Sequence, residues 1–205
     1  MSCNWWRLFL LALSISCLVP ACGKEKAQDV RLEMITTLGT IELELYAEQA
    51  PLTATNFLRL VDGGHFAGAT FYRVVSPAND NGSPVISVIQ GGIGDAASPL
   101  PPIAHETTAT TGLRHLDGSL SMARGEVGTA TTEFFICLGA QRALDYGGTR
   151  NNDGQGFAVF GRVIGGMNVV REIHAAPANA DTDNEYLKGQ LLEQPVVIRS
   201  VRRIR

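Results

Sequence analysis

The sequence lacks three features that would point to particular classes of protein: a basic cluster, a membrane-spanning run and a disulfide framework. Charged residues make up 18% of the 205-residue chain, and the net charge at pH 7 is −3. Because basic side chains are not concentrated in any stretch, the electrostatic footprint of a nucleic-acid-binding protein is missing. The basic C-terminal side chains alternate with apolar ones, which favours the solvated face of a closing strand over a binding patch. They are Arg199, Arg202, Arg203 and Arg205.

The apolar stretch at residues 8–19 (LFLLALSISCLV) is too short to span a bilayer as a helix. It has the length of the hydrophobic region of a signal peptide, and Arg7 precedes it. Residues 19–22 (VPAC) resemble a lipobox, in which the cysteine becomes lipidated. We therefore expect a signal peptide over 1–21, a lipidation site at Cys22 and a tether over 22–29. The protein is then an exported lipoprotein on the periplasmic face of a bacterial membrane.

Two alternatives stay open for the N-terminus. Val19 and Ala21 also suit ordinary signal peptidase, which would give a soluble periplasmic or secreted product. An uncleaved anchor is the third possibility. Cleavage after residue 21 removes one basic and no acidic residue, which changes the net charge from −3 to −4.

Cysteine and histidine positions exclude other kinds of chemistry. Of the four cysteines, Cys3 and Cys17 leave with the signal peptide and Cys22 carries the lipid. Only Cys137 remains, inside an apolar run where a buried, inert thiol is expected. The mature domain is therefore expected to contain no disulfide. The four histidines show no metal-binding spacing, and the stretch 151–156 lacks the ligand pattern of a calcium loop; we expect neither metal nor cofactor.

Hydrophobic residues make up 45% of the chain, which is enough for a sizeable core, and 22 glycines favour a β protein rich in turns. Alternation and turn residues predict eight short strands. Two helices are expected over 51–64, opened by Pro51, and over 165–174. In the third strand we expect Phe71 and Arg73 to share one face, with Tyr72 and Val74 on the other. The predicted strands are 30–37, 40–46, 68–75, 85–90, 118–123, 133–138, 157–163 and 195–204.

The strands do not alternate with helices, so the pattern predicts an antiparallel barrel or sandwich closed at its ends by two helices. Five blocks of this pattern are recognisable in sequence. They are FYRVV (71–75), IQGG (89–92), GSLSMA (118–123), EFFIC (133–137), and FGRV (160–163) followed by GGM (165–167). In their order they resemble the signature blocks of cyclophilins, over about residues 30–205. The resemblance implies a mainly β fold, a closed eight-stranded antiparallel barrel capped by two α-helices, with a packed interior and the active site on an outer face.

The resemblance also implies the site. It places Arg73 at the family's catalytic arginine, Gln90 at the glutamine that holds the substrate backbone, and Phe135 at the floor of the proline pocket. The further substrate-binding positions that it assigns are Ala123, Leu144, Phe157, Glu133 and Ser87. The activity implied is peptidyl-prolyl cis-trans isomerisation, with proline-containing peptides and folding exported proteins as partners, and a monomer is the default.

Several positions depart from the family pattern. Ser87 falls where a second pocket phenylalanine is usual, Glu133 replaces a glutamine and Phe157 replaces the pocket histidine. Ala143 stands in place of the tryptophan associated with cyclosporin binding, and Arg124 replaces an asparagine. We expect activity to survive and cyclosporin to bind poorly. Phe157 is expected to restore, from the opposite wall, the apolar area missing at Ser87.

Elementary chemistry agrees with a catalytic arginine. Rotation about an X-Pro bond costs amide resonance, with a barrier of roughly 18–20 kcal/mol. As conjugation is lost, the prolyl nitrogen becomes a hydrogen-bond acceptor, and Arg73 can donate to it at any working pH. Two rival hypotheses remain: a cyclophilin-like periplasmic chaperone or binding module with little isomerase activity, and a hollow barrel that carries an apolar ligand.

Overall fold

The computed structural model describes residues 30–94 and 97–204. The predicted signal peptide, the Cys22 lipidation site and the tether lie outside these residues. The elements in chain order are β1 (Val30–Thr36), β2 (Thr40–Leu45), α1 (Pro51–Asp62), β3 (Thr70–Val75), β4 (Val88–Gly92), α2 (Thr108–Thr111), β5 (Ser119–Met122), β6 (Phe134–Cys137), the 3-10 helix η1 (Arg142–Leu144), β7 (Ala158–Gly165), α3 (Met167–His174), the 3-10 helix η2 (Glu185–Leu187) and β8 (Leu191–Ile204).

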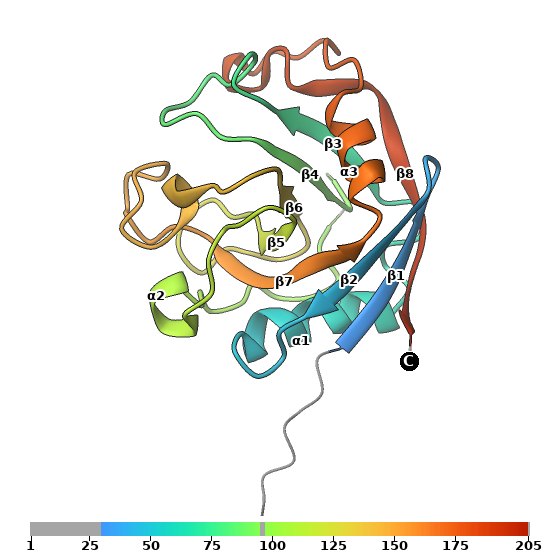
Figure 1. Cartoon of the computed structure of the whole chain (residues 1–205), viewed down its shortest axis with the longest axis vertical. Coiled ribbons are helices and arrows are strands. Elements are labelled where there is room, and N and C mark those ends of the chain that lie inside the picture. Colours follow the sequence, from blue (N-terminus) through green and yellow to red (C-terminus); the bar gives the residue numbers. More distant parts are fainter. Residues whose placement is uncertain (1–29, 95–96, 205) are drawn as a thin grey trace, which may run out of the picture.

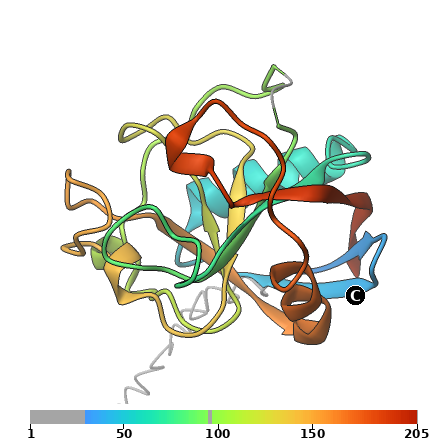
Figure 2. The ribbon, with the colours of Figure 1, turned by 90° about the horizontal axis from the view of Figure 1, so that it is seen from above.

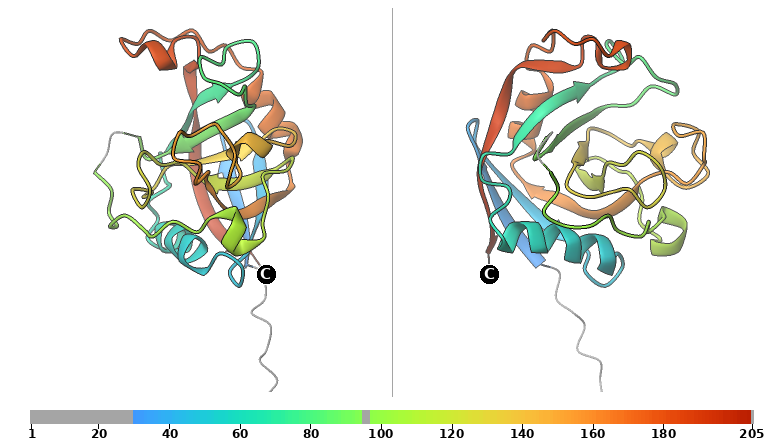
Figure 3. Two further views of the ribbon diagram at one scale, coloured as in Figure 1. Left: turned by 90° about the vertical axis from the view of Figure 1, so that its left-hand side faces the viewer. Right: turned by 180° about the vertical axis from the view of Figure 1, so that it is seen from behind.

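The strands form one closed barrel in the order β1-β2-β7-β5-β6-β4-β3-β8, with every neighbouring pair antiparallel (Figure 1). The first and last strands close it, because β1 pairs with β8 from Arg31↔Ile204 to Thr36↔Ile198. The two longer helices, α1 and α3, cover opposite ends of the barrel (Figures 1 and 3). The predicted closed eight-stranded barrel with two capping helices is thereby confirmed. None of the helices in the described residues is long and apolar enough to cross a membrane.

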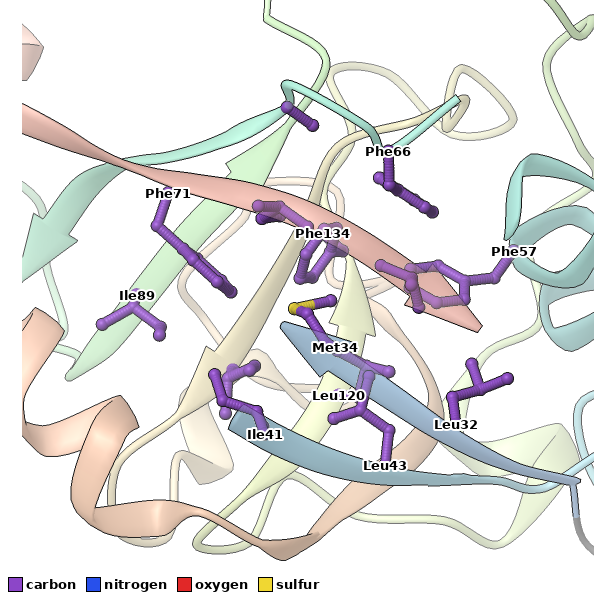
Figure 4. Close-up of a cluster of buried hydrophobic side chains, with 14 of the residues drawn as sticks. Leu32, Met34, Ile41, Leu43, Phe57, Phe66, Phe71, Ile89, Leu120 and Phe134 are labelled. Atoms are coloured by element: carbon purple, nitrogen blue, oxygen red, sulfur yellow. The ribbon is translucent and has the colours of Figure 1, made fainter. Parts of the chain in front are cut away.

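The interior of the barrel is filled by side chains (Figure 4). Alternate residues of β1 and β2, such as Met34 and Leu43, are fully buried and point inward. Phe57 of α1 meets Phe134 of β6 edge-on, with ring centroids 5.4 Å apart, and Phe71 packs against the same ring at 5.6 Å. This packing identifies a stabilising core and contradicts the hypothesis of a hollow, ligand-carrying barrel.

Most element boundaries lie within two residues of prediction, and three parts of the chain differ more. β8 begins at Leu191 rather than at 195 and runs across Pro195. The register with β3 jumps from Phe71↔Val196 to Arg73↔Leu191, so Pro195 lies in an irregular part of the pairing where a missing N–H costs little. β4 begins only at Val88. The segment 91–118, expected to be loop, contains the single-turn helix α2.

The late start of β4 has a local cause. The backbone N–H of Ile86 donates to Asp80 at 2.8 Å, and that of Ser87 donates to the side chain of Gln141 at 3.2 Å. Side chains therefore take the hydrogen bonds that a strand would make. Residues 85–87 consequently belong to the loop between β3 and β4.

Candidate active site

A β-bulge decides which side chains of β3 reach the outer face of the barrel. Between Phe71 and Arg73 the register shifts against both neighbouring strands, β4 and β8. Phe71 and Val74 are buried in the core, while Tyr72 and Arg73 are both partly exposed on the outside. The expectation that Phe71 and Arg73 share a face was wrong, because a bulge inserts one residue and resets the alternation.

The guanidinium of Arg73 is held by two amide side chains. Its Nε and Nη2 donate to Oε1 of Gln190 at 2.9 and 2.6 Å, and Nη1 donates to Oε1 of Gln90 at 3.0 Å. The ring of Tyr186 lies over the guanidinium, 5.1 Å from Cζ. All these partners are neutral, and no carboxylate of the described residues forms an ion pair with Arg73. The full positive charge therefore remains available to a bound molecule.

Gln90 is fixed from its other end. Its Nε2 donates to the hydroxyl of Tyr72 at 2.8 Å, and that hydroxyl donates to Glu133 at 2.6 Å. Burial and the charge of Glu133 raise the pKa of Tyr72, so the phenol stays protonated. The backbone N–H of Gly94 also donates to Glu133, at 3.1 Å. Glu133 thus orders the site through Tyr72.

A second apolar cluster lies on the outer face, beside Arg73. In β6, Phe134 and Ile136 point into the core, whereas Phe135 and Cys137 point outward into this cluster. Cys137 is completely buried, as predicted, and burial raises the pKa of its thiol, which favours the protonated, unreactive form. The full membership is Val75, Ile86, Val88, Phe135, Cys137 and Leu144, with Ala123 and Phe157 packed against it.

All members of this cluster except Cys137 line one cavity of about 410 Å³, together with Arg73. Apolar side chains, Phe135 among them, make its floor, and Arg73 and Gln90 stand at its polar edge. A concave apolar surface with a few converging polar groups is the usual form of a binding site. The lining residues are Arg73, Val75, Ile86, Val88, Gln90, Ala123, Arg124, Gly125, Glu126, Phe135, Leu144, Arg150, Asn151, Phe157 and Tyr186.

Phe157 supplies one wall of the cavity. Its ring meets Phe135 edge-on, with centroids 5.4 Å apart, and the guanidinium of Arg124 lies 5.3 Å from its centroid on another side. Arg124 is itself fixed by Asp153 at 2.7 Å and by the carbonyl of Gly156 at 2.6 Å. Hydrogen bonding from Arg124 lowers the pKa of Asp153 to about 2, so this ion pair persists at neutral pH.

Below Phe135 lies a buried row of polar groups. The imidazole of His115 stacks on Phe135 with centroids 5.9 Å apart, and its two nitrogens contact Asp145 at 2.8 Å and Ser121 at 3.0 Å. Burial lowers the pKa of His115 in spite of Asp145, so the ring is neutral. The order Ser-His-Asp resembles that of a hydrolase triad. Ser121 is fully buried, however, and cannot meet a substrate, so the row supports the floor of the cavity.

Six of the eight residues predicted from sequence come together in this cavity: Arg73, Gln90, Phe135, Ala123, Leu144 and Phe157. The other two do not line it. Glu133 acts through Tyr72, and the hydroxyl of Ser87 lies 3.1 Å from His174 of α3. Ile86 and Val88, the neighbours of Ser87, are the ones that face the cavity.

Sequence reasoning missed three side chains around Arg73: Gln190, Tyr186 and Arg150. Their contacts with β3 and its following loop join positions far apart in the chain, such as Arg73 and Gln190. Tyr186 and Gln190 stand near the end of a polar stretch without a strand or helix pattern. Nothing in that pattern predicts that the stretch returns to β3.

Comparisons with known proteins agree with this geometry. A profile of the family described as "Cyclophilin type peptidyl-prolyl cis-trans isomerase/CLD" matches residues 31–203. Peptidyl-prolyl cis-trans isomerase A of Dickeya dadantii is 33% identical, covering 94% of this chain and 93% of its own. The peptidyl-prolyl cis-trans isomerase of Acinetobacter baylyi is 36% identical over 83% of each chain.

Solved structures show the same fold. The crystal structure of a Cryptosporidium parvum cyclophilin-type isomerase aligns with a TM-score of 0.67 at 20% identity, covering 86% of this chain and 98% of that one. The same protein, determined in the presence of the dipeptide Ala-Pro, aligns with a TM-score of 0.65 at 20% identity, covering 85% of this chain and 99% of that one. With the profile match and the relatives above, these findings show that the chain belongs to the cyclophilin family and is a peptidyl-prolyl cis-trans isomerase.

Proposed function

We propose that Arg73 catalyses the isomerisation and that the proline ring sits against Phe135 and Phe157. The observation that carries this proposal is the guanidinium of Arg73, held by neutral groups alone, at the edge of a cavity floored by apolar side chains. Such a site can grip an uncharged ring and place one fixed positive donor beside it. Bound proline-containing peptides are its natural substrates.

The energetics of the reaction favour this arrangement. A catalyst must stabilise the twisted imide more than either planar isomer. In the twisted state the prolyl nitrogen gains a lone pair that accepts a hydrogen bond, and in both planar states it does not. Three of the five N–H groups of Arg73 are engaged by Gln190 and Gln90, which leaves two for substrate. Gln90, facing the same cavity, is placed to hold the backbone of the peptide.

Replacing the arginine tests the proposal. A protease-coupled assay with a prolyl tetrapeptide would compare the wild-type protein with Arg73→Ala and Arg73→Lys. By analogy with the loss of one preorganised donor, Arg73→Ala is expected to raise the barrier by about 2.7–4 kcal/mol. Arg199→Ala, on the exposed face of β8, is the matched control and is expected to retain full activity. Equal activities of Arg73→Ala and the wild type would refute the catalytic role.

We also propose that the protein is exported, anchored through a lipid on Cys22 and active on exported proteins as they fold. The support is the apolar stretch at residues 8–19 and the lipobox-like residues 19–22, which lie outside the described residues. Cells expressing the wild-type chain are expected to incorporate labelled palmitate into it and to retain it with membranes. Cys22→Ser is expected to lose both properties. A wild-type product that is shortened, unlabelled and soluble would favour plain secretion instead.

A refolding assay addresses the proposed clients. An exported protein whose refolding is limited by a prolyl bond shows a slow phase of tens of seconds or more, because uncatalysed isomerisation is that slow. The wild-type enzyme is expected to accelerate this phase and Arg73→Ala is not. If the phase were unaffected while small prolyl peptides were isomerised, assistance of protein folding would be contradicted.

A further inference from the structure

The chain between α3 and β8 returns to the active site and lies beside the loop 76–87 (Figure 2). The amide of Asn81 in that loop donates to the carbonyl oxygens of Tyr186 and Lys188 at 3.2 and 2.9 Å. These contacts tie η2 to the loop that follows β3. The segment between α3 and β8 brings two side chains onto Arg73.

The first of these side chains is Gln190, which is completely buried. Its Oε1 accepts hydrogen bonds from two nitrogens of Arg73, at 2.9 and 2.6 Å, and its Nε2 donates to the carbonyl of Asn79 at 2.8 Å. The donor and the acceptor of the amide are thus both used, so the amide group cannot flip by 180° without losing a buried hydrogen bond. One edge of the guanidinium is fixed as a result.

The second side chain is Tyr186, whose ring covers one face of the same guanidinium. Its hydroxyl accepts a hydrogen bond of 2.8 Å from Arg150. Arg150 in turn pairs with Asp80 at 2.7 Å, and the side chains of both are almost inaccessible, at 4% and 0% exposure. A buried ion pair, anchored in the loop 76–87, therefore holds the ring over Arg73.

We propose that Gln190 and Tyr186 form a clamp that positions Arg73 for catalysis. The inference rests on the proposed catalytic role of Arg73. Gln190 fixes the edge of the guanidinium and Tyr186 fixes its face, while two N–H groups of this cavity-lining arginine stay available to substrate. Because both partners are neutral, the clamp restricts motion without cancelling the charge that the twisted imide needs. A carboxylate in the place of Gln190 would compete with the substrate for that charge.

A double-mutant cycle tests the clamp. Gln190→Leu removes the acceptor and is expected to lower kcat by about 10- to 100-fold, the order of loss for a misplaced catalytic group, with little change in KM. In the Arg73→Ala background the same change is expected to have no further effect, because its target is gone. Gln194→Leu, at an exposed glutamine of β8 four residues further along the chain, is the matched control. If Gln190→Leu lowered kcat by the same factor in the wild-type and Arg73→Ala backgrounds, the proposal would be overturned.

Tyr186 is the exposed member of the clamp, so a substitution there is expected to leave the fold intact. Tyr186 is 44% exposed, so Tyr186→Ala is expected to fold and to lower kcat several-fold. Tyr186→Phe keeps the ring and is expected to retain more activity. A spectroscopic readout is independent of turnover: the Nε–H resonance of Arg73, assigned by its loss in Arg73→Ala, is expected to exchange slowly with water in the wild type and faster in Gln190→Leu.

The possible failures are distinguishable. Full activity of Arg73→Ala would overturn the catalytic role of Arg73 and the clamp with it. Loss of activity in Arg73→Ala combined with wild-type kcat in Gln190→Leu and Tyr186→Ala would overturn the clamp alone. Unchanged exchange of the Arg73 Nε–H in Gln190→Leu would also contradict it.

Discussion

Tyr72 and Arg73, consecutive residues of β3, are held by opposite ends of one amide group, that of Gln90. The bulge at Tyr72 makes this possible, because it turns both side chains to the outer face. Glu133 accepts from Tyr72, Tyr72 accepts from Gln90, and Gln90 accepts from Arg73. Each donor in this chain of hydrogen bonds from Arg73 to Glu133 has one acceptor, so the orientation of every group is set.

Removing the hydroxyl of Tyr72 interrupts this chain of hydrogen bonds. Tyr72→Phe leaves the Nε2 of Gln90 without its partner, so the amide is free to turn away from Arg73. We expect kcat/KM to fall several-fold and stability to fall by about 0.5–1.5 kcal/mol, the net worth of one hydrogen bond. Peptide isomerisation and denaturant unfolding measure the two effects. Tyr146→Phe, at a tyrosine that is 50% exposed, is the control and is expected to change neither quantity.

Two positions that the family resemblance assigns to the pocket are expected to behave differently. Phe157 faces the cavity and Ser87 faces His174. Phe157→Ala is therefore expected to raise KM and lower kcat/KM, because apolar contact with the substrate is lost. Ser87→Ala is expected to leave both kinetic constants unchanged. Steady-state kinetics on one peptide checks the pair, and a larger effect at residue 87 would contradict the geometry.

The ion pair of Asp80 and Arg150 is expected to be important for stability. Asp80→Ala leaves the buried guanidinium of Arg150 unpaired, for which a loss of about 3–5 kcal/mol is typical. Although burial alone would raise the pKa of Asp80, hydrogen bonds from Arg150, Gly82 and Ile86 lower it. The stabilisation is thus present above the ordinary carboxyl pKa of about 3.9 and is lost as the pH falls below it. Unfolding at several pH values, with exposed Asp183→Ala as control, tests this prediction.

His115 is expected to make the free energy of unfolding depend on pH in a higher pH range than Asp80 does. Because burial lowers the pKa of His115, the unfolded chain binds a proton at this residue before the folded one does. Stability from this group is then complete above the unfolded pKa of about 6.5 and falls as the pH drops below it. The free energy of unfolding between pH 7.5 and pH 5 measures the slope. His115→Gln is expected to flatten it, and an equal slope in that variant would contradict the assignment.

Cyclosporin is expected to inhibit this enzyme weakly. The prediction comes from the family resemblance, which places the tryptophan associated with the drug at Ala143. Ala143→Trp is expected to tighten binding without changing turnover of a short peptide. Titration of the drug against isomerase activity compares the two proteins. Nanomolar inhibition of the wild type would contradict this expectation.

The barrel was predictable because its signals are local. Alternation in the strands, Pro51 at the start of α1 and the turn glycines each act over a few residues. The central pocket was predictable for a different reason, since Arg73, Gln90 and Phe135 stand in recognisable blocks. Those residues lie on strands whose pairing the barrel fixes, as in Gln90↔Phe135.

The surroundings of the site were not predictable, for two physical reasons. A bulge shifts every later side chain of a strand to the other face, and the sequence at Tyr72 carries no sign of one. The family resemblance placed Ser87 in the pocket. The path of the loop there is instead set by hydrogen bonds that the backbone N–H groups of Ile86 and Ser87 donate to the side chains of Asp80 and Gln141. The contact of Gln190 with Arg73 joins residues far apart in the chain, and local sequence patterns do not predict such contacts.

The pairing of β1 with β8 has a consequence for the order of events in folding. Arg31 pairs with Ile204, and Glu33 accepts a hydrogen bond of 2.7 Å from Arg202 across the same seam. The barrel therefore cannot close until the residues of β8 have been synthesised and are free to pair with β1. Up to that moment β1 has a free edge, and Gln190, just before β8, has yet to reach Arg73. The pairing that completes the barrel and supports β3, the strand of Arg73, thus forms only when β8 is in place.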